Sequence, residues 1–216
     1  MLGNKLFLSV FFIFAVTVSA YATTGIEVNG DLKLSGSGTI SFPNGSSQLT
    51  AGACQGRYDD NGNGTVTDCR SGLTWLKNTN CTDTAGGINK PAGYLNWADA
   101  GTWTAHLADG LCNLTDGSSA GDWRLPTKTE GMMMIEYARK MGYINPALTN
   151  AAGTSQWTTN GDAFSNVISA FYWTSATWAD NPAGAWVINT YSGTMTTGIN
   201  GFKGDARYVW PVRDGQ

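Results

Sequence analysis

The sequence predicts an α+β domain over residues 54–216, preceded by a signal peptide and a short β-rich stem. Two apolar stripes of helical period lie in the first half of this domain, and short β-branched and aromatic runs between turn dipeptides fill the second half. Helices and strands that are grouped in this way, rather than alternating, are typical of helices packed against an antiparallel sheet.

Two amphipathic stretches predict the helices. The first begins near Asn96, which can cap the helix with Asp99 in its first turn. Its apolar face is then expected to run through Trp97, Ala100, Trp103, Leu107 and Leu111. The second follows Leu125-Pro126, where Thr127-x-x-Glu130 forms a capping box. Its stripe continues through Met134, Tyr137 or Ala138, and Met141 to a stop at Gly142.

The remainder of the domain reads as strands and turns. We expect five strands: Gln156–Thr159, Phe171–Thr177, Ala185–Tyr191, Gly193–Ile199 and Arg207–Arg213. Alternation predicts that Trp173 and Trp186 face the core, together with at least one of Tyr208 and Trp210. Trp178 differs because it precedes the turn-forming Ala179-Asp180-Asn181-Pro182, which would leave the indole near a loop.

Residues 1–22 have the pattern of a secretory signal peptide. Lys5 precedes an apolar run from Leu6 to Val18, and Ala20 and Ala22 supply the small residues of a cleavage site. Because this run is too short to cross a bilayer, we expect a secreted or cell-surface protein without a membrane span. A formal net charge of −3 does not favour nucleic acid as a partner.

Residues 23–53 stand apart through their turn-rich pattern. Alternating apolar residues recur from Ile26 to Phe42, and turn dipeptides interrupt or follow them: Asn29-Gly30, Ser35-Gly36 and Asn44-Gly45. The stretch contains too few apolar residues to close a core alone. It is similar to the repetitive β stems that precede the heads of some phage tail fibres and surface adhesins, often as trimers. Either a β stem that assembles copies of the chain or a flexible linker fits this pattern.

The even number of cysteines is typical of disulfides in an exported chain. Cys54 and Cys69 flank Asn61-Gly62 nearly symmetrically, so a hairpin over 54–69 would place them opposite each other. Cys81 and Cys112 would then clamp the segment that contains the first helix. We therefore expect Cys54–Cys69 and Cys81–Cys112 disulfides. A metal site is less favoured, because there is no C-x-x-C pair and one histidine in the chain.

The stretch DDNGNGTVTD, residues 59–68, has two interpretations. Asp59, Asn61 and Asn63 fall at positions 1, 3 and 5 of an EF-hand-like calcium loop. However, Arg70 occupies position 12, where a bidentate glutamate belongs, and a strand rather than a helix follows. A two-residue Asn-Gly turn explains the same residues without an ion. We favour the turn and keep calcium as the alternative; no other cofactor is expected.

No arrangement of residues points to an enzyme. His106 is the single histidine, and no nucleophile motif, zinc motif or phosphate-binding loop accompanies it. We therefore expect a non-enzymatic protein in which exposed aromatic residues, flanked by Asn, Asp and Thr, contact a sugar or a protein surface.

Six blocks carry a resemblance to a known family. They occur in this order: GRYDDNGNGTVTDCRSGLTWLK (56–77), NWADA (96–100), GDWRLPT (121–127), YWTSAT (172–177), AWVI (185–188) and YVWPVR (208–213). Over residues 54–216 the chain resembles the Lcl C-terminal domain family, which takes its name from a collagen-like adhesin. The resemblance implies a C-type-lectin-like fold with two helices, a twisted antiparallel sheet and long loops. It also implies a secreted or surface protein that serves in attachment, and the namesake domain is associated with sulfated glycosaminoglycans.

The same resemblance implies a binding face on the C-terminal loops. Its candidate residues are Trp178, Asp180, Asn181, Tyr191, Asn200, Phe202 and Lys203. Trp178-Ala179-Asp180 only partly matches the calcium-and-sugar motif of true C-type lectins, so calcium-dependent sugar binding of that type is not expected. Gly131 replaces a bulky apolar residue of the family, and we expect it to loosen the first turn of the second helix.

These observations predict an exported adhesion protein that recognises a glycan, including a glycosaminoglycan, or a surface protein. The alternative is a structural one, in which residues 54–216 form the head of an extracellular fibre assembled as a homo-oligomer through residues 23–53.

Overall fold

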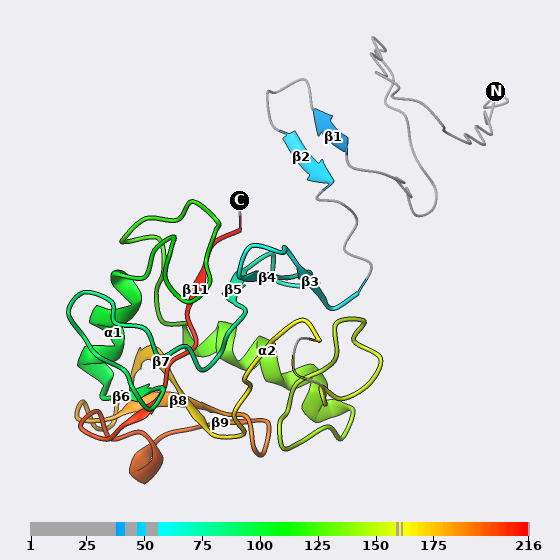
Figure 1. Ribbon diagram of the computed structural model, residues 1–216. Coiled ribbons are helices and arrows are strands. Elements are labelled where there is room, and N and C mark those ends of the chain that lie inside the picture. The colour runs from blue at the N-terminus through cyan, green and yellow to red at the C-terminus, as the bar shows by residue number, and fades with distance from the viewer. Residues whose placement is uncertain (1–37, 42–46, 51–55, 159, 161, 216) are drawn as a thin grey trace, which may run out of the picture. The chain divides into compact units, whose positions relative to one another are not determined.

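The computed structural model describes residues 38–41, 47–50, 56–158, 160 and 162–215. Residues 1–22, the expected signal peptide, lie outside the described residues, as do most of residues 23–53 and Cys54. The contacts divide the chain into two units, Met1–Ala53 and Cys54–Gln216, which are described separately. In the first unit, β1 (Gly38–Ser41) and β2 (Ser47–Thr50) form an antiparallel pair (Figure 1).

The second unit contains two sheets. One has the order β6-β10-β7-β8-β9, formed by β6 (Tyr94–Leu95), β10 (Arg207–Tyr208), β7 (Phe171–Thr177), β8 (Ala185–Asn189) and β9 (Thr194–Thr196). The other has the order β11-β5-β4-β3, formed by β11 (Val212–Arg213), β5 (Thr74–Leu76), β4 (Thr65–Asp68) and β3 (Tyr58–Asp60). All pairs are antiparallel except β7 with β10. With two helices and two sheets, the unit has the predicted α+β class.

The expected strand Arg207–Arg213 is in fact two strands in different sheets. β10 lies between β6 and β7, whereas β11 pairs with β5. Trp210, in the short connection between them, is fully buried and donates its indole N–H to the Leu76 carbonyl at 2.9 Å. The C-terminal segment therefore joins the two sheets across the core. Periodicity alone predicted one strand because both halves contain β-forming residues.

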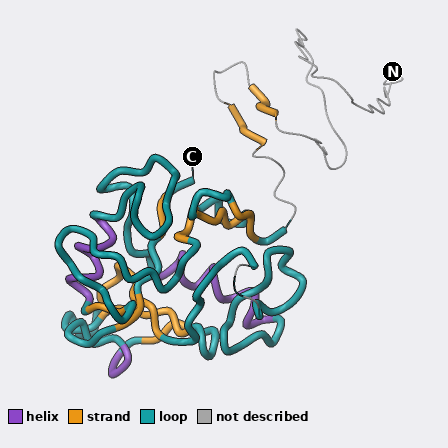
Figure 2. The backbone as a smooth tube through the Cα atoms, in the orientation of Figure 1, coloured by secondary structure: helices purple, strands orange, loops and turns teal. Residues whose placement is uncertain are grey.

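Other expected strands are absent or shorter than the sequence pattern implied. Gln156–Thr159 is not a strand among the described residues, and Gln156 makes an isolated bridge with Thr149. After β9, the chain forms the 3₁₀ helix η1 (Gly198–Asn200) instead of continuing to Ile199 as a strand. Loops occupy much of the second unit, as Figure 2 shows.

Helix α1 (Trp97–Ala105) begins where predicted. The Asn96 side chain accepts the Asp99 backbone N–H at 2.9 Å, which satisfies one of the free donors at the helix start. The helix ends before Leu107, which is nevertheless fully buried in the following loop. The predicted burial of Leu107 is therefore confirmed, but the prediction that Leu107 lies within the helix is wrong.

Helix α2 (Lys128–Lys140) has the predicted capping box between Thr127 and Glu130. It packs on β8 and β9, and a Cβ at Gly131 would lie 2.6 Å from Cγ1 of Ile188. Gly131 therefore lets the helix approach the sheet closely, and its effect on the first turn of α2 stays a prediction. Ile135 contributes to the buried face, whereas Met141 is 51% exposed at the C-cap.

Aromatic side chains fill the core of the second unit. The fully buried indoles are Trp75, Trp103, Trp123, Trp173 and Trp210. Among the aromatic residues that were expected to face the core, Trp173 and Trp210 are buried and Tyr208 is half-buried. Trp186 is also only half-buried, with the Lys128 Nζ 3.2 Å from its ring centroid. The start of α2 covers this indole, so it is not part of the central core.

Candidate ligand-binding site

The Trp-Arg-Leu-Pro-Thr block has structural roles throughout. Trp123 is buried and donates its indole N–H to the Ser118 hydroxyl at 3.0 Å. Arg124 holds the Glu130 carboxylate through two hydrogen bonds of 2.8 and 2.9 Å, and these bonds raise the pKa of Arg124 above its usual value. Thr127 caps α2. These residues therefore hold the start of α2, and the polar groups named here are engaged within the fold rather than presented to a ligand.

The Tyr-Trp-Thr-Ser block is used in the same way. Trp173 donates to the Leu95 carbonyl at 2.8 Å, and the Thr174 hydroxyl donates to the Trp186 carbonyl at 2.7 Å. The Tyr172 hydroxyl donates to the Ile168 carbonyl at 2.9 Å, and burial raises the pKa of this phenol above its usual range. These groups are satisfied inside the fold, so the ligand surface must be sought elsewhere.

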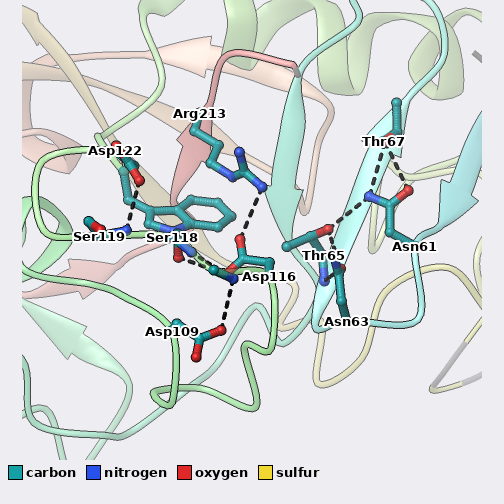
Figure 3. A network of polar contacts seen from close by, with 12 residues as sticks. Asn61, Asn63, Thr65, Thr67, Asp109, Asp116, Ser118, Ser119, Asp122 and Arg213 are labelled. Atoms are coloured by element: carbon teal, nitrogen blue, oxygen red, sulfur yellow. Dashed lines mark hydrogen bonds and ion pairs between the residues drawn. The ribbon is translucent and has the colours of Figure 1, made fainter.

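A polar network anchors the C-terminus on a loop (Figure 3). Arg213 points to Asp116, donating to its carboxylate at 3.0 Å, and the guanidinium lies 5.3 Å from the Trp123 ring centroid. The other Asp116 oxygen accepts from the Ser118 hydroxyl at 2.7 Å. Asp109 accepts the Gly117 backbone N–H at 2.9 Å. Each of these groups has a partner within the protein, which indicates a role in loop structure.

The stretch 59–68 is a hairpin between β3 and β4. Because β3 ends at Asp60 and β4 begins at Thr65, the connection is residues 61–64 and not a two-residue Asn-Gly turn. The Asn61 N–H donates to the Thr65 carbonyl at 3.1 Å. The Asn61 amide group bonds Thr65 and Thr67, and the Asn63 side-chain oxygen accepts from Thr65 (Figure 3). Asp59 is exposed and lies opposite Thr67. The two asparagines expected as calcium ligands therefore hold the hairpin together through their side chains.

One of the two expected disulfides lies within the described residues. Cys81 and Cys112 are bonded, with their Cα atoms 5.5 Å apart. Cys69 is also disulfide-bonded, but Cys54 lies outside the described residues. The hairpin register places Cys69 opposite Arg57, so the expected symmetry about Asn61-Gly62 is wrong.

Among the described residues, one group of potential metal-binding side chains converges: Cys81, Asp83 and Cys112. Both sulfurs are in the disulfide, so this group offers no thiolate ligand. His106 is exposed at the end of α1, where its Nδ1 lies 2.8 Å from the Thr102 carbonyl oxygen. Neither arrangement builds a metal or catalytic site.

The C-terminal loops contain the candidate site, and a short β-like contact organises it. Residues 201–203 run antiparallel to residues 183–185: the Ala185 N–H donates to Gly201 at 2.8 Å and the Lys203 N–H donates to Ala183 at 2.9 Å. Between these two bonds, Gly184 lies directly opposite Phe202. Side chains approach most closely at such a non-hydrogen-bonded pair and project to the same face.

Trp178 occupies the space that Gly184 leaves open. A Cβ at Gly184 would lie 3.2 Å from Cε3 of Trp178, so the indole covers the glycine on the face to which Phe202 projects. The Trp178 indole N–H donates to the Asp180 carboxylate at 3.2 Å. Trp178 is half-buried, Asp180 is exposed and Phe202 is 42% exposed. We call these three residues the aromatic platform.

Lys203 projects to the opposite face of this contact, because successive side chains of an extended segment alternate. Its Nζ donates to the Thr177 hydroxyl at 2.8 Å and lies 4.1 Å from the ring centroid of Trp97. Trp97 in turn donates its indole N–H to the Thr174 carbonyl at 2.8 Å. The lysine is therefore part of a contact that joins the loop to the start of α1.

The remaining expected site residues divide into two groups. The Asn181 side-chain oxygen accepts the Ala183 backbone N–H at 3.1 Å, and the Asn200 carbonyl accepts Arg207 Nε at 2.8 Å, so both residues support the loops. Tyr191, 58% exposed, follows the far end of β8 from Gly184, and its carbonyl accepts the Asn145 N–H. Of the expected ligand residues, the structure thus groups Trp178, Asp180 and Phe202 in the aromatic platform.

Sequence reasoning missed Gly184 and Trp97 as parts of this region. Nothing local marks Gly184, because its importance comes from Phe202 and Trp178 lying beside it. Trp97 had been assigned only to the apolar face of the helix.

Among the described residues, no helix combines the length and apolar character needed to cross a bilayer. A comparison with curated proteins found no match. A family model, the Lcl C-terminal domain, matches residues 64–213, beginning in the connection between β3 and β4 and ending at β11. This match covers more than half of the sequence and includes the Trp-Arg-Leu-Pro and Tyr-Trp-Thr-Ser blocks whose side chains build the fold. The chain therefore belongs to the Lcl C-terminal domain family.

Proposed function

We propose that this is an adhesin-like, non-enzymatic binding protein of the cell exterior, which attaches to a glycan or a surface protein through its C-terminal loops. The observation that carries the proposal is the aromatic platform, in which Gly184 gives Trp178 a place beside the exposed Phe202. Aromatic side chains with a polar group at their edge are well suited to such recognition, because they bury a large area at low conformational cost.

Membership in the Lcl C-terminal domain family also supports this proposal, because the family suggests an adhesin-like protein. The motif residues are engaged in the fold, whereas the platform lies on loops outside those blocks. Binding residues are found disproportionately on loops held by a rigid scaffold. We further propose that the domain is C-type-lectin-like, with its ligand on the long loops, and that it binds without calcium or another cofactor.

The test is attachment of the purified mature protein to immobilised glycans, glycosaminoglycans and extracellular-matrix proteins. Trp178→Ala should weaken attachment by about tenfold, because a central aromatic contact commonly contributes this much or more. Tyr191→Ala is the matched control, since Tyr191 is also an exposed aromatic residue but lies at the other end of β8. Equal attachment by the wild type and both variants would refute the proposed site. Attachment that disappears in chelator would refute the proposal that calcium is not required.

A structural role is the second candidate. It rests on the antiparallel pair β1–β2, which lies in the segment expected to form a stem. Under this proposal, residues 54–216 are the head of an extracellular fibre and residues 23–53 assemble copies of the chain.

A further inference from the structure

We infer that the aromatic platform takes a neutral, hydroxyl-rich saccharide rather than a sulfated or carboxylated polyanion. This inference rests on the proposed binding function and names the ligand class of the same site.

The platform offers the two contacts that a neutral sugar ring requires. Trp178 and Phe202 lie on one face of the Gly184–Phe202 contact, where they present apolar surface to the C–H face of a pyranose. Asp180 lies at the indole edge, held at 3.2 Å by the Trp178 N–H, and its exposed carboxylate can accept hydrogen bonds from sugar hydroxyls. If a sulfate or carboxylate group of a ligand took the place of such a hydroxyl, the Asp180 carboxylate would repel it.

The nearby lysine does not supply the missing positive charge. Lys203 projects away from Phe202, and its ammonium is engaged with the Thr177 hydroxyl and the Trp97 ring. To reach a polyanion on the platform, it would have to leave both partners.

The other cation of these loops is engaged as well. Arg207 donates to the carbonyls of Asn200 and Ala206, each at 2.8 Å, and to the Asp205 carboxylate at 2.9 Å. Residues 178–207 contain no further lysine or arginine. A sulfated chain would therefore meet the exposed carboxylate of Asp180, while Lys203 and Arg207 are engaged elsewhere. A neutral saccharide meets no such charge repulsion.

The experiment measures binding of the intact mature protein to immobilised neutral polysaccharides, namely a glucan, a mannan and a galactan, and to heparin as the polyanion. We expect at least one neutral polysaccharide to bind. Its affinity should change by less than about twofold between ~50 and ~500 mM sodium chloride, because no ion pair is screened. Trp178→Ala and Phe202→Ala should each weaken this binding by about tenfold.

Two variants separate the charge argument from the aromatic one. Lys203→Met should leave neutral-polysaccharide binding within about twofold of the wild type, because the ammonium lies on the other face. Asp180→Asn keeps an oxygen acceptor but removes the charge, so it should improve heparin binding relative to neutral binding. Phe202 is already exposed, so Phe202→Ala tests the site even if Trp178→Ala unfolds.

The inference is overturned if no neutral polysaccharide binds. It is also overturned if heparin binds in a salt-sensitive manner that Phe202→Ala and Lys203→Met both weaken; the proposed binding site would then stand with a different ligand class. If Trp178→Ala and Phe202→Ala fold normally and change no attachment at all, the proposed function fails with it.

Discussion

Lys90 is a fully buried lysine whose ammonium has no hydrogen-bond partner among the described residues. Its Nζ lies 4.1 Å from the ring centroid of Trp103, so an aromatic face is its main compensation. Burial lowers the pKa of Lys90 from 10.5 to about 8, and the nearby Asp83 carboxylate opposes this effect. The residue therefore changes charge in the folded protein at a lower pH than in the unfolded chain.

This difference predicts a specific dependence of stability on pH. Below about pH 8, Lys90 is protonated in both states and the folded protein bears the full cost of burying the charge. Between about pH 8 and 10.5, the folded state has released the proton while the unfolded chain still holds it, so this residue makes the free energy of unfolding rise with pH.

The measurement is the difference in melting temperature between the wild type and Lys90→Met from pH 7 to 10. The variant should be the more stable protein at pH 7, and its advantage should shrink as the pH rises. A difference that stays constant over this range would show that Lys90 keeps its proton in the folded protein. Taking the difference cancels the titration of groups that both proteins share.

At the scale of the element, Gly131 lies where α2 packs tightly on β8. A Cβ there would lie 2.6 and 2.8 Å from two side-chain carbons of the buried Ile188. Alanine would gain about 1 kcal/mol of helix propensity, but overpacking typically costs about 1–3 kcal/mol. We therefore predict that Gly131→Ala lowers the free energy of unfolding by about 1 kcal/mol.

Two comparisons make this prediction specific. Gly101 lies inside α1 with nothing within 4 Å of its Cβ position, so Gly101→Ala should stabilise the protein by about 0.5–1 kcal/mol. In an Ile188→Ala background, which removes both clashing atoms, Gly131→Ala should become neutral or stabilising. Chemical denaturation measures all four variants. Stabilisation by Gly131→Ala in the wild-type background would mean that the helix can move away from β8 at little cost.

The elements show which parts of the fold the sequence could predict. The starts of both helices were predicted correctly, because a cap is a local interaction between a residue and one three positions later. The end of α1 was not, since Leu107 is buried as an apolar residue of that pattern would be but lies in a loop. The division of Arg207–Arg213 between two sheets depends on distant partners, which periodicity does not contain.

The candidate site was predictable to a similar extent. The turn-forming residues after Trp178 correctly placed this indole beside a loop. The grouping of Tyr191 with Trp178 was not supported by the geometry, because residues close in sequence lie at opposite ends of β8. The role of Gly184 and the opposite directions of Phe202 and Lys203 depend on a bridge between segments, so they emerged only from the structure.

At the scale of the whole molecule, the stem proposal makes a prediction about mass in solution. If residues 23–53 assemble copies of the chain, residues 23–216 should form an oligomer, and residues 54–216 should be monomeric under the same conditions. Sedimentation equilibrium at high protein concentration measures both. A monomer in both cases would count against the fibre proposal and would leave residues 23–53 as a linker.

The two functional proposals differ in what they require of the platform. A fibre head does not require the aromatic pair Trp178 and Phe202. An adhesin that binds through this pair should cover both side chains when its ligand binds. The described residues also include exposed apolar side chains on and after α2, namely Met132, Met133, Met141 and Ile144. A direct test must therefore distinguish the platform from these side chains on the same molecule.

Hydroxyl-radical footprinting of the intact mature protein, with and without the polysaccharide that binds it best, makes this distinction. Tryptophan, phenylalanine, tyrosine and methionine side chains all report on their own exposure in one experiment. We expect that oxidation of Trp178 and Phe202 falls when the polysaccharide binds, while Tyr191, Met132 and Met133 remain as reactive as before. Protection of Met132, Met133 or Tyr191 with no change at Trp178 and Phe202 would contradict this expectation.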